Sequence, residues 1–430
     1  MRKIALAVTL TVTLALAMVG CANPQDKKTE QKGDPVKITY IHRLPDGEGM
    51  TKVADIVKRW NDANPGIQVT ATKFDGKAQA LAVKLETDIK ANAGPCLAQL
   101  SYNEIPEMYV KGLLQDVTAE AKKYQKNYGG AFGQMTLAGK TTGLPQDSGP
   151  LVYLYDAKEF KALDIKVPTT LDEFKAAAAK AAAKGKYIAA FTPDETAYWL
   201  SAQTAAAGGV WYKTEGDKWK VNLDSLEAQK VAKFWQDMID AKSVLTLDRW
   251  SDAYTKAIAD GRLIGNLSAA WETGFALDGL DGTPREGQWR VAQIPDFGAG
   301  AKTGPDGGSG VAVMKGCAHP AEAMKFNDWF NTQVDDLATQ GLVPAAVQPA
   351  KTPAKMARQF GGQDVRAVLA QANKNLSQDF IYIPGFSAVV PKTTETAAKV
   401  AAGNGKVADV FAAAKTSSFQ ALKSLGLPAI

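Results

Sequence analysis

Cysteine and histidine are scarce in this sequence, which contains three Cys and two His among 430 residues. Zinc and other transition metals are held mainly by thiolate and imidazole groups, so little material is available for a metal site of that kind. His319 precedes Pro320 at the start of a predicted helix and has no second ligand nearby. We therefore expect His319 at the surface, and we expect no metal and no other cofactor.

Long apolar runs and blocks of basic charge are also rare. The run from Ile4 to Val19 is the longest, and it is shorter than the ~20 apolar residues that a membrane-spanning helix needs. The formal net charge is +5, but Lys and Arg are dispersed among Asp and Glu. This dispersion argues against a nucleic-acid-binding surface. The chain is 46% hydrophobic and 22% charged, the composition of a globular protein long enough for two domains.

The N-terminus has the parts of an export signal, with Arg2 and Lys3 before the apolar run and small residues after it. Met18-Val19-Gly20-Cys21 resembles the lipobox of bacterial lipoproteins, with Met18 in place of the usual leucine. The resemblance implies a lipoprotein signal peptide at residues 1–20 and an acylated, palmitate-bearing Cys21 as the new N-terminus. The alternative is an ordinary signal peptide with an incidental cysteine. Residues 21–35 have almost no apolar content, so we expect a flexible, lipid-anchored linker there.

From Val36 onward, strand and helix patterns alternate. Apolar alternation and short apolar runs predict strands at Val36–Tyr40, Ile67–Ala71 and Cys96–Leu100. Helical spacing predicts a helix around Val53–Trp60 and another around Leu81–Ile89. This order predicts an α/β fold with a mostly parallel sheet and helices on its faces. Ligands of such sheets gather at the carboxyl ends of strands.

The rest of the chain continues the alternation. A capping box at Thr170–Glu173 predicts a helix that ends near Gly185, and a second helix is predicted over Leu226–Asp240. The glycine-rich segment Gly298–Gly310 is interpreted as a mobile connector. Further elements are predicted as strands at Leu151–Leu154 and Val311–Met314 and a helix at Ala321–Asn331.

The order of several motifs is similar to that of the extracellular solute-binding proteins of carbohydrate ABC importers (family 1, the maltose-binding-protein type). Pro168–Phe174 resembles the family's Pro-x-Thr-Trp-x-Glu-Phe helix start, with Leu171 in place of the tryptophan. The other similar segments are Trp60–Val69, Gly143–Gly149 with Val152–Asp156, Ala257–Trp271, Ile294-Pro295, Gly310–Val313 and Pro320–Phe326. Each motif is weak alone, but their order behind a lipobox is specific.

This resemblance implies an α/β fold with two lobes, the type II periplasmic-binding-protein-like architecture, with a ligand cleft between lobes joined by a multi-crossing hinge. The first lobe would comprise residues 36–145 and 308–350, and the second residues 146–307 and 351–430. The implied function is that of a substrate-binding protein, not an enzyme, which captures a sugar or oligosaccharide by hinge closure. It would deliver the sugar to the permease subunits of an ABC transporter. The expected location is the outer face of the cytoplasmic membrane, extracellular or periplasmic, as a lipid-anchored monomer.

A sugar presents apolar C–H faces and a rim of hydroxyl groups, so its site needs flat aromatic rings and planar polar groups. The resemblance implies a stacking ring at Trp271 and another at Tyr198 or Trp199, one of which should face the core. The full predicted ligand-binding set is His42, Arg43, Tyr102, Asn103, Gln146, Asp147, Tyr198, Trp199, Trp271, Glu272 and Phe386. A structural loop role is the alternative for the first four. Val390 stands where maltose-binding protein has a stacking tryptophan, so the sugar class stays open.

Cys96 and Cys317 remain once Cys21 is assigned to lipid. In the family fold the strands that carry these two residues are neighbours running in opposite directions. The resemblance therefore implies a disulfide between Cys96 and Cys317, which would stabilise the fold by ~2–4 kcal/mol. Two separate buried thiols are the alternative.

Two other functions are compatible with the sequence. A glycoside hydrolase would need two carboxyl groups across one glycosidic bond, for which Asp147 and Glu272 are the candidates. A binding protein of the same fold could instead hold a non-sugar solute such as a peptide or polyamine. Several aromatic residues with few paired charges favour a sugar over a small ion.

Overall fold

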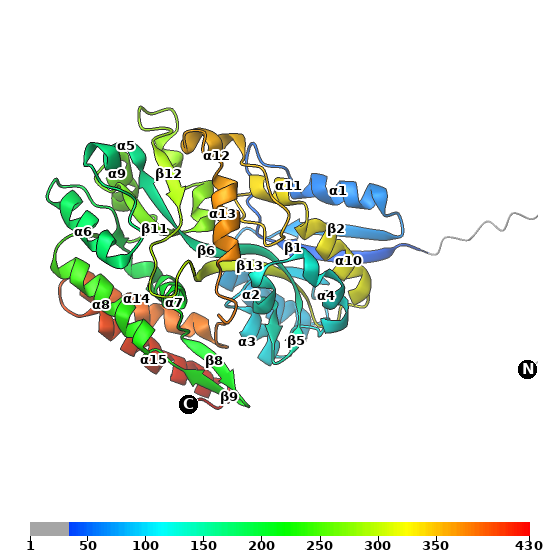
Figure 1. Cartoon of the computed structure of the whole chain (residues 1–430). Helices are drawn as coiled ribbons and strands as arrows, with labels where there is room; N and C mark the ends of the chain where they lie inside the picture. The colour runs from blue at the N-terminus through cyan, green and yellow to red at the C-terminus, as the bar shows by residue number, and fades with distance from the viewer. Residues whose placement is uncertain (1–33) are drawn as a thin grey trace, which may run out of the picture.

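The computed structural model of the chain describes residues 34–430 (Figure 1). The predicted signal peptide, Cys21 and most of the predicted linker lie outside the described residues. Within residues 34–430, no helix is both long and apolar enough to cross a membrane.

A seven-stranded sheet runs through the molecule in the order β11-β6-β13-β3-β1-β2, with β12 paired to β6. Its strands are β1 (Val36–His42), β2 (Ile67–Lys73), β3 (Leu97–Ser101), β6 (Gly143–Asp156), β11 (Gly265–Ala269), β12 (Trp289–Ala292) and β13 (Pro305–Val313). Short strands form three further pairs: β4 (Thr136–Leu137) with β5 (Lys140–Thr141), β7 (Ala190–Phe191) with β10 (Leu245–Thr246), and β8 (Tyr212–Glu215) with β9 (Lys218–Val221).

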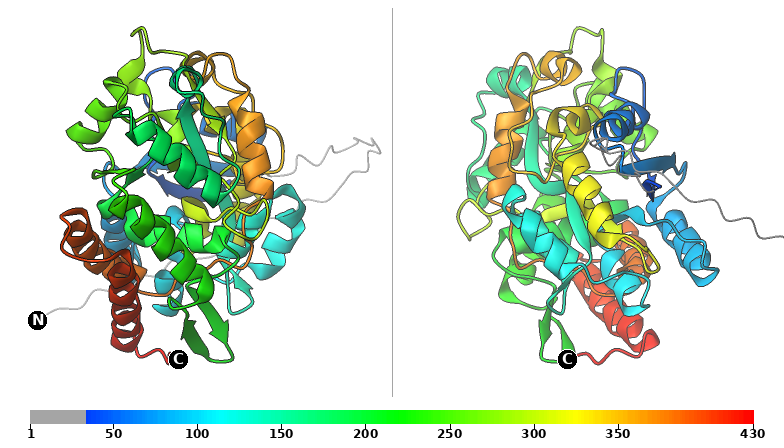
Figure 2. Two further views of the ribbon diagram at one scale, coloured as in Figure 1. Left: turned by 60° about the vertical axis from the view of Figure 1, so that its left-hand side comes forward. Right: turned by 90° about the vertical axis from the view of Figure 1, so that its right-hand side faces the viewer.

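The helices gather on two sides of the strands β6 and β13 (Figure 1). On one side lie α1 (Val53–Ala63), α2 (Ala78–Lys90), α3 (Ile105–Val110), α4 (Thr118–Tyr124) and α10 (Pro320–Asn331). On the other lie α5 (Ala157–Ala162), α6 (Leu171–Ala182), α7 (Thr196–Ala206), α8 (Leu226–Asp240), α9 (Asp252–Ala259), α14 (Val389–Ala401) and α15 (Val407–Ser424). The remaining helices are α11 (Val334–Thr339), α12 (Ala354–Gln359) and α13 (Val365–Lys374). In Figure 2 the left view brings forward the side that carries α6 and α8, and the right view faces the side that carries α1 and α10.

Local sequence explains why the best-formed helices begin where they do. Ser225 accepts a hydrogen bond from the Ala228 backbone N–H at 3.2 Å and caps α8, whose bounds match the predicted ones. Thr170 caps α6, because its hydroxyl accepts from the Glu173 N–H at 3.2 Å. The predicted capping box forms only in part, since the Glu173 carboxylate accepts from the Thr169 N–H rather than from that of Thr170. The buried face of α1 consists of Val53, Ile56, Val57 and Trp60, the spacing that predicted the helix.

The prediction of a mostly parallel sheet is correct for its first strands and wrong for the rest. β1 pairs in parallel with β2 and β3, whereas β13 runs antiparallel to both β3 and β6. β11 and β12 are also antiparallel to β6. Strand direction depends on how distant segments meet, and a local apolar pattern carries no information about that.

The prediction of a mobile connector at Gly298–Gly310 is also corrected by the structure. From Pro305 onward this segment is the strand β13, which lies between β3 and β6. Its glycines allow close approach of other groups. At Gly308, with φ +100°, an added Cβ would lie 2.7 Å from the ring of Tyr102. The glycines therefore fit a packed strand rather than a loose linker.

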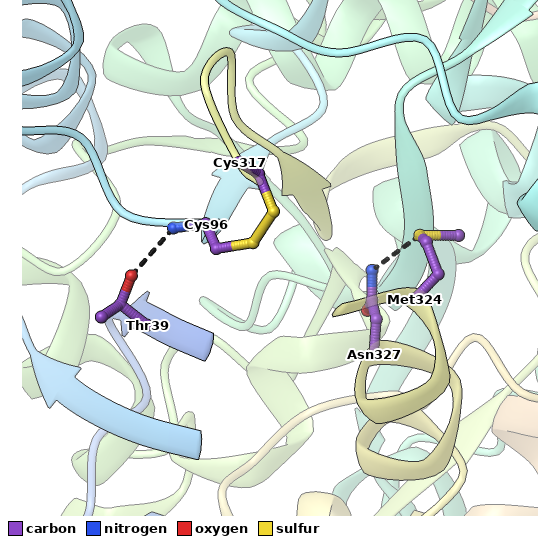
Figure 3. The surroundings of a disulfide bond; sticks show 5 residues. All are labelled: Thr39, Cys96, Cys317, Met324 and Asn327. Atoms are coloured by element: carbon purple, nitrogen blue, oxygen red, sulfur yellow. Dashed lines mark hydrogen bonds between the residues drawn. A yellow bond between two sulfur atoms is a disulfide. The ribbon is translucent and has the colours of Figure 1, made fainter. Parts of the chain in front are cut away.

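Cys96 and Cys317 are joined by a disulfide in the structure (Figure 3). The antiparallel register of β3 and β13 pairs Leu97 with Val313, which brings the two cysteines to the same end of the sheet. The Cys96 backbone N–H also donates to the Thr39 hydroxyl of β1 at 2.9 Å. The bond lies at the amino end of β3, the end opposite Ser101.

We expect reduction of this disulfide, or the double variant Cys96→Ala with Cys317→Ala, to lower the free energy of unfolding by ~2–4 kcal/mol. The physical reason is that the bond restricts the unfolded chain across a sequence separation of 221 residues. Denaturant titration with and without reductant measures this difference. Thiol titration of the unfolded, unreduced protein is the direct check, and two reactive thiols besides any at Cys21 would contradict the bond.

Candidate ligand-binding cleft

A cleft of about 1080 Å³ lies between the two groups of helices. One wall comes from the loop after β1 and from α2, the β3–α3 turn and α3. The opposite wall comes from α7, the short 3-10 helix η4 (Ala270–Gly274), the start of α12 and the start of α14. The floor includes residues of β6 and β13. Both walls therefore depend on segments that are distant in sequence.

Trp271 is the aromatic platform of the cleft. It lies on η4, directly after strand β11. Its indole N–H donates to the Asp306 backbone carbonyl at 2.8 Å. The guanidinium carbon of Arg249 lies 5.5 Å from the centre of the ring, a cation–π contact. The hydrogen bond at the indole N–H and the cation–π contact with Arg249 therefore hold the ring in place without a ligand.

Arg249 is the centre of a buried charge cluster behind this platform. Its side chain is 1% exposed, and its guanidinium forms ion pairs with Glu195 at 2.7 Å, with Asp306 at 3.5 Å and with Glu272. The three carboxylates come from the short helix η3 (Pro193–Glu195), from β13 and from η4. Removing one partner from such a cluster leaves an uncompensated buried charge, so the four groups hold their segments together.

Two acids of this cluster, Asp306 and Glu272, have raised pKa values. Burial raises the pKa of Asp306 to about 7, although the Arg249 guanidinium favours its ionised form. Burial likewise raises the pKa of Glu272, against the opposing effect of Arg249. Glu195, which is partly exposed, lines the cleft together with Asp306. The cluster therefore presents hydrogen-bonding carboxyl groups to the cleft beside an aromatic ring.

The opposite wall carries a second polar group of residues. The Arg43 guanidinium donates to the Ser101 hydroxyl at 3.0 Å. Glu104 accepts from the Ser101 backbone N–H at 2.9 Å, and burial raises the pKa of Glu104. Asn103 lies between these two residues and also lines the cleft. These carboxylate, amide and guanidinium groups match the hydroxyl-binding chemistry described above.

Five predicted residues line the cleft in the structure, namely Arg43, Asn103, Asp147, Tyr198 and Trp271. They come from both walls and from the floor. Asp147 accepts a hydrogen bond from the Val343 backbone N–H at 2.7 Å, and burial raises its pKa to about 7. Whether these five residues contact a ligand stays a prediction.

The other six predicted residues lie behind the cleft wall. Their positions therefore do not support direct contact with a ligand. His42 faces inward because it shares the β1 face of the buried Tyr40, and burial lowers its pKa to about 4. Gln146 points away from the cleft because it precedes Asp147 on a strand, and its amide donates to Asn331 at 3.0 Å.

The aromatic members of this group are core residues. Trp199 donates to the Leu267 carbonyl at 2.9 Å. Of the adjacent residues Tyr198 and Trp199, it is the one that faces the core. The Tyr102 hydroxyl donates to the Asp147 carbonyl at 2.8 Å. Phe386 is fully buried and packs against the ring of Tyr198, 5.2 Å between ring centres. Glu272, the sixth residue, is the fully buried partner of Arg249.

Sequence reasoning missed Arg249, Glu195 and Asp306 altogether. Arg249 lies in the loop between β10 and α9, where no periodic pattern marks a buried side chain. Asp306 lies in the glycine-rich segment that was predicted to be mobile. The one weak signal for a buried ion pair is the presence of an arginine in a chain whose basic residues are mostly lysines. A planar guanidinium pairs with buried carboxylates better than a lysine ammonium group does.

One segment of chain separates this cleft from a second groove of about 810 Å³. Ala338 and Leu342 line the cleft, and both carbonyls accept from the buried Arg366, at 2.9 and 2.6 Å. The next residues, Val343 and Pro344, line the second groove together with Arg366. Consecutive parts of one segment, the strap of residues 338–350, therefore line the two hollows. Among residues 34–430, no group of three or more His, Cys, Asp or Glu side chains is placed to hold a metal ion.

Comparison with solved structures supports this fold. The galacto-N-biose/lacto-N-biose I-binding protein of an ABC transporter from Bifidobacterium longum, solved with lacto-N-biose, is 50% identical, with a TM-score of 0.85. The similarity covers 93% of this chain and 99% of that one. A binding protein associated with an ABC transporter of B. animalis subsp. lactis, solved with β-1,6-galactobiose, is 24% identical over 92% of this chain and 99% of its own, with a TM-score of 0.72.

More distant structures share the fold alone. The sugar-binding protein MalE of Xanthomonas citri is 15% identical over 90% of this chain and 98% of its own, with a TM-score of 0.73. No curated protein matches the chain. Residues 45–334 match the sequence profile of bacterial extracellular solute-binding proteins. This match includes the cleft residues from Pro45 to Ser309, but neither Arg43 and Leu44 nor the lining residues after 334. The α/β fold, the order of motifs and the profile agree, and the chain belongs to the bacterial extracellular solute-binding protein family.

Proposed function

We propose that this protein captures a neutral disaccharide or short oligosaccharide in the cleft and delivers it to the permease subunits of an ABC transporter. The observation that carries the proposal is the 50% identity to a binding protein solved with lacto-N-biose, over 93% of this chain. The cleft supports it with an aromatic platform at Trp271 and with polar groups on both walls. A sugar would stack one apolar face on the ring and direct its hydroxyls to those groups.

We further propose that the cleft closes by a hinge between two lobes, residues 36–145 with 308–350 and residues 146–307 with 351–430. The boundaries at 145/146 and 307/308 fall within β6 and β13, the strands that run between the two groups of helices. The third boundary falls at the end of the strap. Closure would bring Arg43 and Asn103 of one wall toward Tyr198 and Trp271 of the other.

Binding without chemical conversion is the proposed role. The hydrolase alternative relied on Asp147 and Glu272 as a catalytic pair. Glu272 is fully buried, and one of its carboxylate oxygens accepts from the Ala269 N–H at 2.8 Å and from Arg249. That arrangement favours a structural role for Glu272. Release of shorter saccharides after prolonged incubation with oligosaccharides would favour the hydrolase instead.

The protein as proposed acts as a monomer, tethered by lipid on Cys21 to the outer face of the cytoplasmic membrane. The lipobox-like segment and the export signal support this location. A tether would keep the cleft near its transporter and raise the local concentration for delivery.

A thermal-shift panel tests the proposed ligand class. We expect lacto-N-biose, galacto-N-biose or β-1,6-galactobiose to raise the melting temperature, because a ligand that binds the native state stabilises it.

The variant Trp271→Ala should weaken sugar binding by about ten- to a hundred-fold in calorimetric titration, through loss of the stacking surface. Trp329→Ala, which removes a partly buried ring that does not line the cleft, is the matched control and should leave the affinity unchanged. A shift with peptides or polyamines but with no saccharide would overturn the sugar assignment.

The raised pKa of Asp306 predicts how stability depends on pH. An unfolded Asp titrates near pH 4, whereas native Asp306 titrates at about 7. Between these values the native state binds more protons than the unfolded state, so this residue's contribution to the unfolding free energy falls as pH rises. We expect Asp306→Asn to reduce the decline between pH 4.5 and 7 by up to about 1 kcal/mol per pH unit. Denaturant melts of parent and variant across that range measure the two slopes, and identical slopes would contradict the assignment.

The lipid anchor is tested with Cys21→Ser in a bacterial host that processes lipoproteins. The parent should partition into the membrane fraction and into detergent, and the variant should be recovered in the aqueous phase. Mass spectrometry of the parent should find Cys21 as an acylated N-terminal residue. An unmodified Cys21, or cleavage at another position, would contradict the proposed tether.

A further inference from the structure

One peptide group of the strap lies between two buried side chains of opposite charge. The carbonyl oxygen of Leu342 accepts a hydrogen bond from the Arg366 guanidinium at 2.6 Å. The N–H of the same peptide group, which belongs to Val343, donates to the Asp147 carboxylate at 2.7 Å. The C=O and N–H of a planar trans peptide point in opposite directions. Arg366 and Asp147 therefore lie on opposite sides of one peptide group and are joined through it.

The two charged side chains line different hollows. Asp147 is 6% exposed and lines the ligand cleft, whereas Arg366 is 4% exposed and lines the second groove. Arg366 is the second residue of α13, a helix capped by the Asp364 side chain. Its backbone N–H donates to the Thr352 hydroxyl at 3.1 Å. The start of α13 thus fixes the backbone from which the guanidinium reaches the strap.

The two charges compensate each other across the peptide. The groups that Arg366 bonds directly are neutral carbonyls, and a buried cation is costly unless an anion compensates it. Burial lowers the pKa of Arg366 to about 10, and the largest opposing effect is the charge of Asp147. Burial raises the pKa of Asp147 to about 7, and Arg366 is the charged group that opposes this rise. A cation at the carbonyl and an anion at the N–H also match the direction of the peptide dipole.

Other titratable groups approach Asp147 from neighbouring elements. The Tyr102 hydroxyl, from the β3–α3 turn, donates to the Asp147 backbone carbonyl at 2.8 Å. Burial holds the pKa of Tyr102 well above its ordinary value, so this hydroxyl stays neutral. On β13, Ser309 pairs with Asp147 in the sheet register, and Asp306 lies three residues before Ser309. Asp306 has a pKa in the same range as Asp147, so a test must separate the two acids.

We propose that Arg366 is a positioning residue for ligand binding, which acts through the Leu342–Val343 peptide to keep the Asp147 carboxylate ionised and oriented toward the ligand. This inference rests on the proposed function and on contact between Asp147 and a hydroxyl of the sugar. An ionised carboxylate accepts hydrogen bonds from hydroxyl groups, and such charge-assisted bonds are roughly twice as strong as neutral ones. Arg366 thus strengthens the binding of a saccharide that it does not touch.

The first test compares two substitutions of Arg366. Arg366→Gln keeps a hydrogen-bond donor for the strap and removes the charge, whereas Arg366→Lys keeps both. We expect Arg366→Gln to bind lacto-N-biose about five- to ten-fold more weakly than the parent at about pH 7.5, because Asp147 is then mostly protonated. Arg366→Lys should stay within about three-fold of the parent. Calorimetric titration measures the affinities, melting temperatures establish folding, and Arg366→Met is the second uncharged variant if the first does not fold.

The pH profile separates an effect of charge from a loss of packing. The affinity of the parent should rise between about pH 5.5 and about pH 8, because the ionised form of Asp147 binds the sugar better and its pKa is about 7. Without the guanidinium the pKa of Asp147 rises further, so the increase should move to higher pH. The two proteins should then agree within about two-fold at about pH 5.5. The carbon-13 resonance of the Asp147 carboxyl, assigned by its absence from Asp147→Asn, reports the same titration without a ligand.

A double-mutant cycle with Asp147→Asn isolates the path of the effect. In that background the charge of Arg366 has no carboxylate to act on, so Arg366→Gln should change the affinity by less than about two-fold. Any pH dependence that remains there belongs to other acids, such as Asp306. Arg262→Gln is the matched control, because it removes an exposed arginine that lines neither hollow. It should change neither the affinity nor the pH profile.

Each outcome bears on one of the two proposals. A loss of affinity by Arg366→Gln that is equal with and without Asp147→Asn, or absent from the parent background, would overturn the positioning role and leave the proposed function intact. A parent protein that binds no saccharide would overturn the proposed function, and with it the role of Arg366 in binding. A loss that requires Asp147 and is accompanied by a shifted pH profile supports both.

Discussion

Arg249 brings a positive charge into the interior, and the three carboxylates that surround it come from η3, η4 and β13. None of these segments could move alone without separating opposite charges in a medium of low polarity. Trp271 depends on the same cluster, through its contact with the guanidinium and its hydrogen bond to Asp306. The aromatic wall of the cleft is therefore formed before a ligand binds, which reduces the ordering that binding would otherwise require.

The second constraint is the path of β6 and β13 through the middle of the molecule. Each strand contributes residues to the floor of the cleft, and each continues into the helices of one side or the other. Alternation along β6 sends Gln146 toward α10 and Asp147 toward the cleft. The strap at 338–350 lies against the same part of β6, with the Ala345 N–H donating to the Gln146 carbonyl at 3.1 Å. The strap that lies against β6 thus contains residues that line the cleft and residues that line the second groove.

The sequence predicted those parts of this arrangement that local chemistry determines. The bounds of α8 and the cap of α6 follow from side chains within one turn of the helix end. Which member of an adjacent pair faces the cleft was harder to predict, because a strand that is buried on both faces gives no polar alternation. His42 was assigned to the site with Arg43 at a strand end, and Gln146 with Asp147 at the crossover between lobes. In each pair only the second residue lines the cleft. The role of Arg249 could not be predicted from the sequence, because its three carboxylate partners come together only in the folded chain.

The disulfide has a consequence for a protein that is exposed to proteases outside the cell. Cys96 and Cys317 close a covalent ring that includes most of the cleft wall formed by α7 and η4. A single cut of the backbone in any exposed loop between these cysteines divides the chain into two peptides that remain joined through sulfur. Such a nicked molecule keeps its pieces together at a fixed stoichiometry.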